Sequence, residues 1–159
     1  MQHGFLKVAV ATPSIRVADC KYNAQQIIAL IKRAEQDGAA LLALPELCIT
    51  GYTCSDLFMQ DALQRGALGA LSEIMAASRD TEMLLVVGMP LTVRHSLFNC
   101  AIVLQRGSIL GVVPKTYLPN YSEFYEKRLF APAPDTVSAI HVLGSEVLFG
   151  SKLLFCCTT

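Results

Sequence analysis

The chain has 159 residues, and its 13 basic side chains balance its 13 acidic ones, so its formal net charge at pH 7 is zero. This length suits one domain and is too short for two ordinary enzymatic domains. No basic stripe is visible, which argues against nucleic acid as a partner. Apolar residues make up 53% and charged residues 16% of the chain, an unusually apolar composition for a soluble domain. We therefore expect much of the surface to be covered, and a homo-oligomer is one way to cover it.

The longest apolar stretches, residues 39–44 and 83–90, are far shorter than the roughly 20 residues needed to cross a bilayer. The sequence therefore predicts no membrane-spanning helix and no membrane partner. Residues 1–4 contain neither a basic region nor a small-residue cleavage site of the kind that signal peptides carry. We expect a cytoplasmic location.

Cysteines are frequent, but they form no CxxC pair, and only three histidines accompany them. In a reducing compartment this distribution is typical of buried thiols rather than of disulfides or zinc ligands. The sequence therefore predicts no metal site. The six are Cys20, Cys48, Cys54, Cys100, Cys156 and Cys157.

The beginning of the chain follows a strand-helix-strand order. Residues 5–11 are a short apolar run and predict a buried strand. From Asp19 the pattern changes: Asp19 or Asn23 can cap a helix, and apolar side chains recur at helical spacing until Asp37-Gly38. Residues 39–44 form a second apolar run that Pro45 ends. A crossover of this kind normally joins two parallel strands.

The middle of the chain continues with a helix and then turns to strands. Residues 61–78 carry a helical apolar stripe, and residues 83–88 read as a third buried strand. Two strand-like runs, residues 97–104 and 109–113, flank the turn at residues 105–108 and predict an antiparallel hairpin.

The last part of the chain mixes loop and strand signals. Residues 114–134 contain four prolines but are rich in aromatic side chains, which predicts an ordered, functional loop rather than a linker. Strand character returns at residues 136–143 and 152–157, and the second of these reaches the end of the chain without a partner. There is no internal repeat or linker, so we expect one α/β unit.

Two charged residues stand where chemistry is expected. Glu46 follows a buried strand, and open α/β sheets place their sites beyond the carboxyl ends of strands, where a general base would lie. Lys115 ends the second hairpin strand, where its compact positive charge could stabilise an oxyanion. Each has a more ordinary alternative, an ion pair for Glu46 and a surface position for Lys115. Neither residue is diagnostic by itself.

Two longer segments favour the catalytic interpretation. Residues 44–58 (LPELCITGYTCSDLF) and 114–130 (PKTYLPNYSEFYEKRLF) resemble two signature regions of the nitrilase superfamily, which uses a Glu-Lys-Cys triad on an α-β-β-α sandwich. Their sequences most resemble those of the glutaminase domains of glutamine-dependent NAD synthetases, and the expected strands and helices fall in the family's order. The resemblance implies a nitrilase-like α/β sandwich that is incomplete at the C-terminus, with residues 1–159 a partial glutaminase domain.

The resemblance also assigns roles to matching residues. It makes Glu46 the general base and Lys115 the cation that stabilises the oxyanion. Glu126 matches a Glu-x-Arg element and would orient Lys115, although Glu123 is close enough in sequence to compete. Arg128 completes the element and can be purely structural.

Two tyrosines match positions that line the family's glutamine pocket or its ammonia exit. These are Tyr52 and Tyr121. Each could equally be an aromatic wall of the core. The position of Tyr121 in the loop after Lys115 favours a role in substrate binding.

The nucleophile is where the sequence departs from the family. The family's cysteine lies in a segment resembling Ile-Cys-Glu-Asp-x-Trp, and this chain has no tryptophan. Cys156 and Cys157 lack that context and are expected to be strand residues. Cys48 and Cys54 flank Glu46, but the matching family positions are not catalytic. The chain is therefore expected to be inactive by itself.

The resemblance implies glutamine as substrate and a C-N ligase reaction in NAD biosynthesis. Ammonia released from the glutamine amide would serve the ATP-dependent amidation of deamido-NAD in a separate synthetase domain. ATP and magnesium would bind in that domain, whose Ser-Gly-Gly-x-Asp-Ser phosphate loop is missing here, and this portion would need no cofactor. Two alternatives stay open: a non-catalytic binding or assembly module with the nitrilase fold, and a different nitrilase-type amidase.

Overall fold

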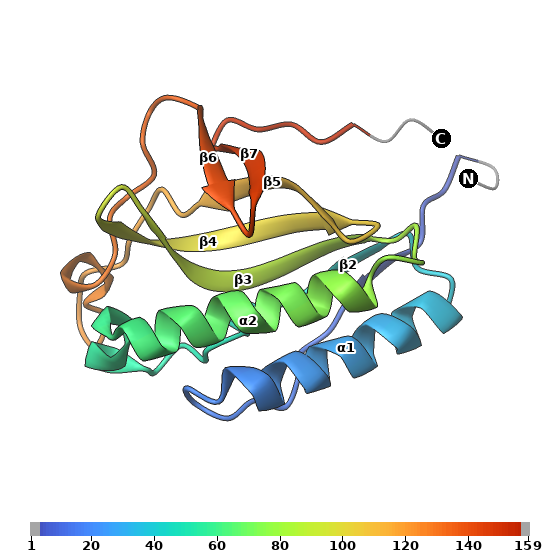
Figure 1. The fold of residues 1–159 in the computed structure, drawn as a ribbon, viewed down its shortest axis with the longest axis horizontal. Coiled ribbons are helices and arrows are strands. Elements are labelled where there is room, and N and C mark those ends of the chain that lie inside the picture. Colours follow the sequence, from blue (N-terminus) through green and yellow to red (C-terminus); the bar gives the residue numbers. More distant parts are fainter. Residues whose placement is uncertain (1–3, 157–159) are drawn as a thin grey trace.

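The computed structural model describes residues 4–156 of the chain. Residues 1–3, used above to argue against a leader, and Cys157 lie outside this range. Helices α1 (Cys20–Gln36) and α2 (Asp61–Ala77) lie side by side against one face of a mixed sheet, as Figure 1 shows. Neither of these helices is long and apolar enough to span a membrane.

The expected strand-helix-strand unit is present. Strand β1 (Val8–Val10) pairs in parallel with β2 (Leu41–Ala43), and α1 connects them. The side chain of Asp19 caps α1 by accepting a hydrogen bond of 3.0 Å from the backbone N–H of Tyr22. The crossover is therefore set by local sequence signals, as predicted.

The prediction that the first strand is buried is wrong. Val8 is 60% exposed and Val10 is 83% exposed. The reason is that β1 is the edge strand of the sheet, and the helices cover only one of its faces. The apolar composition of this strand does not reveal that its other face lacks a cover among the described residues.

The centre of the sheet consists of three long strands. β3 (Leu84–Val93) pairs in parallel with β2 and antiparallel with β4 (Ser96–Gln105), which in turn pairs antiparallel with β5 (Ser108–Pro114). The predicted helix and hairpin are confirmed. The third strand was predicted to end at residue 88, but it continues through Pro90, which faces Asn99 on β4.

The sheet ends in a second hairpin, β6 (Ser138–Val142) and β7 (Ser145–Phe149). The strand order is β1-β2-β3-β4-β5-β7-β6, with β7 parallel to β5. The sequence predicted β6 but missed β7, and the described part of the predicted final strand, residues 152–156, has no regular structure. Instead, Leu153 and Phe155 lie over Gly111 of β5, within 3.1 Å of where a Cβ would be.

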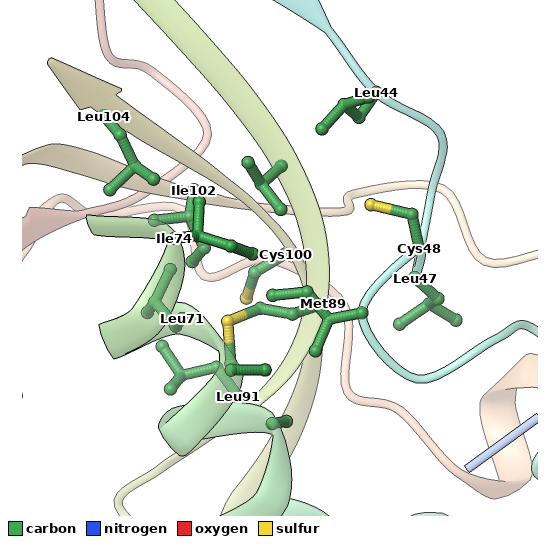
Figure 2. Close-up of a cluster of buried hydrophobic side chains, with 14 of the residues drawn as sticks. Leu44, Leu47, Cys48, Leu71, Ile74, Met89, Leu91, Cys100, Ile102 and Leu104 are labelled. Atoms are coloured by element: carbon green, nitrogen blue, oxygen red, sulfur yellow. The ribbon is translucent and has the colours of Figure 1, made fainter. Parts of the chain in front are cut away.

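The core lies between the helices and the sheet. Figure 2 shows Leu71 and Ile74 of α2 facing Met89 of β3 and Ile102 of β4. All four side chains are fully buried. Burying such a side chain contributes about 1.5–3 kcal/mol to the stability of the fold. Two short 3-10 helices, Ser55–Met59 and Glu126–Arg128, complete the structure. The predicted α/β class is confirmed, with helices on one face of a mixed sheet.

Candidate active site

Glu46 lies in a tight loop that crosses over β3. The chain leaves β2 and folds into successive turns, with Cys48 N–H donating to Pro45 O (3.3 Å) and Gly51 N–H donating to Leu47 O (2.7 Å). The loop passes so close to β3 that a Cβ on Gly88 would lie 2.4 Å from Pro45 O and 2.5 Å from Leu47 N. The glycine therefore allows the loop to rest directly on the middle of the sheet.

Lys115 is delivered to the same place from β5. Its backbone N–H donates to Asn99 O on β4 (2.8 Å), which extends the β4–β5 pairing by one residue. Its Nζ lies 2.7 Å from Glu46 Oε1 and 3.0 Å from Glu126 Oε1. The two residues singled out by the sequence, 69 positions apart, are thus in direct contact.

Glu126 completes the cluster from the loop after β5. It begins the 3-10 helix Glu126–Arg128 and is only 4% exposed. Its Oε1 accepts hydrogen bonds from Lys115 Nζ and from the Tyr52 hydroxyl, the latter at 2.7 Å. Among the described side chains, Glu126 Oε2 is buried and has no hydrogen-bond partner. Of the two candidates Glu123 and Glu126, Glu126 is therefore the one that joins Glu46 in contact with Lys115.

Tyr52 and Lys115 both keep their protons in this arrangement. Burial alone would lower the pKa of Lys115, but its hydrogen bonds to Glu46 and Glu126 and the charges of both carboxylates raise it, and the net shift is upward. Burial raises the pKa of Tyr52, and the hydrogen bond to Glu126 raises it further. At neutral pH Lys115 is consequently a cation and hydrogen-bond donor rather than a base.

A further residue of the cluster, Asn99, was missed by the sequence analysis. It lies in β4, is 4% exposed, and its Nδ2 donates a hydrogen bond to Glu46 Oε1. The available signal was a single amide within the otherwise apolar run Leu97–Leu104, since a buried amide needs a partner. That signal indicates a buried hydrogen bond but not its partner.

A cavity of about 270 Å³ opens beside this cluster. Half of the residues that line it are aromatic, and its wall includes the following residues: Tyr52, Phe58, Phe124, Glu126, Leu129 and Phe130. Tyr121 lies apart from the charged cluster, is 67% exposed, and packs edge to face on Phe124 with the ring centroids 5.6 Å apart. Arg128 pairs with Asp56 at the surface, 3.3 Å away, in line with a structural role. Of the predicted site residues, the structure thus brings together all but Tyr121.

The cysteines near Glu46 are buried thiols, as the sequence predicted. Cys48 Sγ donates to Gly88 O (3.6 Å) and Cys54 Sγ donates to Thr50 O (3.2 Å). Burial raises the pKa of both thiols, that of Cys48 to about 11, so neither is an activated thiolate. Cys156 is exposed. Within residues 4–156, no three His, Cys, Asp or Glu side chains are grouped as a metal site would require.

The buried thiols predict a loss of stability at alkaline pH. Burial raises the pKa of Cys20 and Cys48 from 9.0 to about 11, and it also raises that of Cys54 and Cys100. Because the pKa of each thiol is higher in the folded protein than in the unfolded chain, its contribution to folding stability is fully present below pH 9.0. This contribution is lost as the pH rises toward 11, where the unfolded chain releases the thiol proton more readily. Each thiol lowers the free energy of unfolding by up to about 1.4 kcal/mol per pH unit in that window.

Urea unfolding at a series of pH values measures this loss. Cys48→Ala should make the decline above pH 9.0 shallower, because one raised pKa is removed. Tyr52 and Lys115 act in the same direction, but only above their ordinary values of 10.0 and 10.5. A free energy of unfolding that stays constant from pH 9.0 to 11 would contradict the prediction.

Residues 7–156 match the family model of the carbon-nitrogen hydrolases, and the chain belongs to this family. Among characterised relatives, it is 43% identical over 154 residues to the glutamine-dependent NAD(+) synthetase of Mycobacterium tuberculosis. This match covers 97% of the chain but only 23% of the relative. The resemblance deduced from the two signature segments is therefore confirmed, and the chain spans about a quarter of the length of this relative.

The structure is similar to solved members of the family. It matches a glutamine-dependent NAD(+) synthetase from Cytophaga hutchinsonii with a TM-score of 0.89 and 28% identity, over 96% of this chain and 26% of that one. It also shares the fold of an amidase from Nesterenkonia sp., with a TM-score of 0.71 and 24% identity, over 90% of this chain and 54% of the amidase. The predicted nitrilase-like fold is confirmed.

Proposed function

We propose that these residues form the base and cation portion of a glutaminase site in a glutamine-dependent NAD synthetase. The observation that carries the proposal is Lys115 Nζ, held 2.7 Å from Glu46 and 3.0 Å from Glu126 beside an aromatic cavity. A protonated lysine fixed by two carboxylates can stabilise an oxyanion without taking up a proton itself. The likeness to the synthetases of M. tuberculosis and C. hutchinsonii supports glutamine as the substrate.

The resemblance implies a reaction through the thioester of a cysteine that we do not find among these 159 residues. Glu46 accepts the proton of the attacking thiol as its sulfur bonds to the side-chain amide carbon of glutamine, and Lys115 stabilises the oxyanion. Glu46 then protonates the departing nitrogen, so that the C–N bond breaks and ammonia leaves. Water, activated by the same carboxylate, attacks the thioester and restores the thiol with release of glutamate. The ammonia is consumed in the ATP-dependent amidation of deamido-NAD.

The remaining site residues act on substrate and geometry. Glu126 orients Lys115, and Tyr52 donates its hydroxyl to Glu126 while lining the cavity. The resemblance gives Tyr121 a role in substrate binding, and its ring packs on Phe124, which lines the cavity. The four buried cysteines are not activated, and Cys156 and Cys157 lack the sequence context of the family's nucleophile, so we expect the chain alone to be inactive. ATP and magnesium belong to the synthetase domain, and the enzyme is a cytoplasmic homo-oligomer.

The test compares two nitrogen donors in the protein encoded by the complete open reading frame. Glu46→Gln and Lys115→Met should each lower glutamine-dependent NAD formation by about 10²–10³-fold, because one removes the base and the other the oxyanion cation. NAD formation from added ammonia should be unchanged, since it bypasses the site. The chain of 159 residues should release no ammonia from glutamine above background.

Two results would contradict this assignment. One is full glutamine-dependent activity in Lys115→Met. The other is ammonia release by the chain of 159 residues that disappears in Cys156→Ala or Cys157→Ala, which would place the nucleophile among the last residues of this sequence.

The alternative is a non-catalytic module that needs no further part of an enzyme, and one observation weighs against it. Apolar side chains are strongly exposed at Phe5 (82%), Val10 (83%) and Leu154 (99%), as on a surface that another chain covers. A stable, monodisperse preparation of the chain without measurable self-association would favour such a module over an enzyme portion. Aggregation or concentration-dependent oligomers would favour the enzyme portion.

A further inference from the structure

We propose that Asn99 is a positioning residue that sets the placement of Glu46 relative to Lys115. Its side-chain Nδ2 donates to Glu46 Oε1, and its backbone oxygen accepts from Lys115 N–H at 2.8 Å. One residue of β4 therefore holds the base through its amide and the cation through its main chain. The inference rests on the roles proposed for Glu46 and Lys115.

The position of Asn99 follows from the register of the sheet. Gly88 of β3, on which the Glu46 loop rests, pairs with Ala101 of β4. Because side chains two residues apart on a strand share a face, Asn99 stands on the same face as Ala101, next to the loop. The loop and Asn99 are thereby fixed by the same strand pairing, which keeps their separation constant.

Burial favours the hydrogen bond from Asn99 to Glu46 over other orientations of the amide. The residue is 4% exposed, so an amide group turned away from Glu46 would find little water to replace that contact. The amide and Lys115 Nζ both contact the same carboxylate oxygen of Glu46, Oε1. Oε2 is therefore left for proton transfer. Without Asn99, Lys115 alone would hold the carboxylate, which could then rotate and exchange its two oxygens.

The kinetic test uses Asn99→Leu and Asn99→Asp, two replacements of similar size that lack the amide donor, in the full-length enzyme. Both should lower the glutamine-dependent kcat by about 10²-fold with little change in KM, since Asn99 lies behind the carboxylate and not against the substrate. Ammonia-dependent activity should not change.

Thr81→Val is the matched control. Thr81 is also 4% exposed, and its hydroxyl oxygen accepts a hydrogen bond from Met83 N–H far from Glu46 in sequence. Its loss removes a buried polar contact of the same kind without touching the proposed site. If Asn99→Leu behaves like Thr81→Val, with unchanged kcat and unchanged KM, the positioning role is refuted.

A measurement on the chain itself separates this inference from the proposed function. The side-chain NH₂ signals of Asn99 in a ¹⁵N NMR spectrum should shift in Glu46→Gln and not in Glu82→Gln, a control carboxylate at the surface that contacts Arg106. Unshifted signals would overturn the contact on which the inference stands. Shifted signals combined with full glutamine-dependent activity of Lys115→Met in the full-length enzyme would support the positioning contact while refuting the proposed function.

Discussion

Lys115→Met should lower the free energy of unfolding of this chain by about 1–3 kcal/mol, the cost of leaving a buried acceptor without its partner. The cost stays below that of breaking a fully buried ion pair, because the side chain of Lys115 is 28% exposed. The side chain of Glu126 is only 5% exposed, and Lys115 is the cation that it contacts at 3.0 Å. Methionine keeps the length and volume of the lysine stem, so the loss comes from the charge. Urea unfolding at neutral pH measures the change.

The neighbouring residue Lys127 provides the control. It is exposed on the same short 3-10 helix, so Lys127→Met should change stability by no more than about 0.5 kcal/mol. Adding Glu126→Gln to Lys115→Met should restore part of the loss, because the buried group left without its cation is then neutral. Equal effects of the two lysine substitutions would mean that Glu126 does not depend on Lys115.

The sequence predicted the fold best where the determinants are local. The helix that Asp19 caps and the hairpin around Arg106-Gly107 were both predicted, because capping and turn residues lie within the elements that they delimit. The turn between β6 and β7 is different. It uses Leu143 and Gly144 with φ of 49° and 82°, and leucine rarely adopts such a conformation, so β7 was missed.

Errors about burial and pairing have a non-local cause. The run at residues 152–157 was interpreted as a strand, but its described part, residues 152–156, has no regular structure. An apolar run becomes a strand only where a neighbouring strand supplies its hydrogen bonds. Val10 was expected to be buried because it lies in an apolar run, but that run forms the edge strand of the sheet. The apolar composition of a segment indicates that its burial would be favourable, whereas the topology of the fold decides whether another element covers it.

The residues of the candidate site also differ in whether local sequence could predict them. Glu46, Lys115, Tyr52 and Glu126 stand in two recognisable segments, and the structure brings those segments together. Asn99 lies outside both segments and 53 positions from Glu46, so only the sheet register reveals the contact. A residue whose role arises from strand pairing leaves little trace in the sequence around it.

Gly88 has a role that likewise arises only from the tertiary structure, and Gly88→Ala tests it. The added methyl would lie 2.4 Å from Pro45 O, 2.5 Å from Leu47 N and 2.9 Å from Glu46 C. These are backbone atoms, so the loop must move away as a unit. We expect a loss of about 1–3 kcal/mol in stability, as for other overpacked sites. In the full-length enzyme, glutamine-dependent activity should fall by about 10²-fold, since displacement of a catalytic group by about 1 Å has that effect.

Gly69→Ala on α2 is the matched control for this substitution. A Cβ at Gly69 meets nothing within 4 Å, so the same change of glycine to alanine should stabilise the helix by about 0.5–1 kcal/mol. Opposite signs at the two positions would show that the cost at Gly88 comes from the Glu46 loop and not from the loss of a glycine. A Gly88→Ala variant with undiminished stability and activity would mean that the loop does not need to rest on β3. The placement of the base would then have to depend on Asn99 and Lys115 alone.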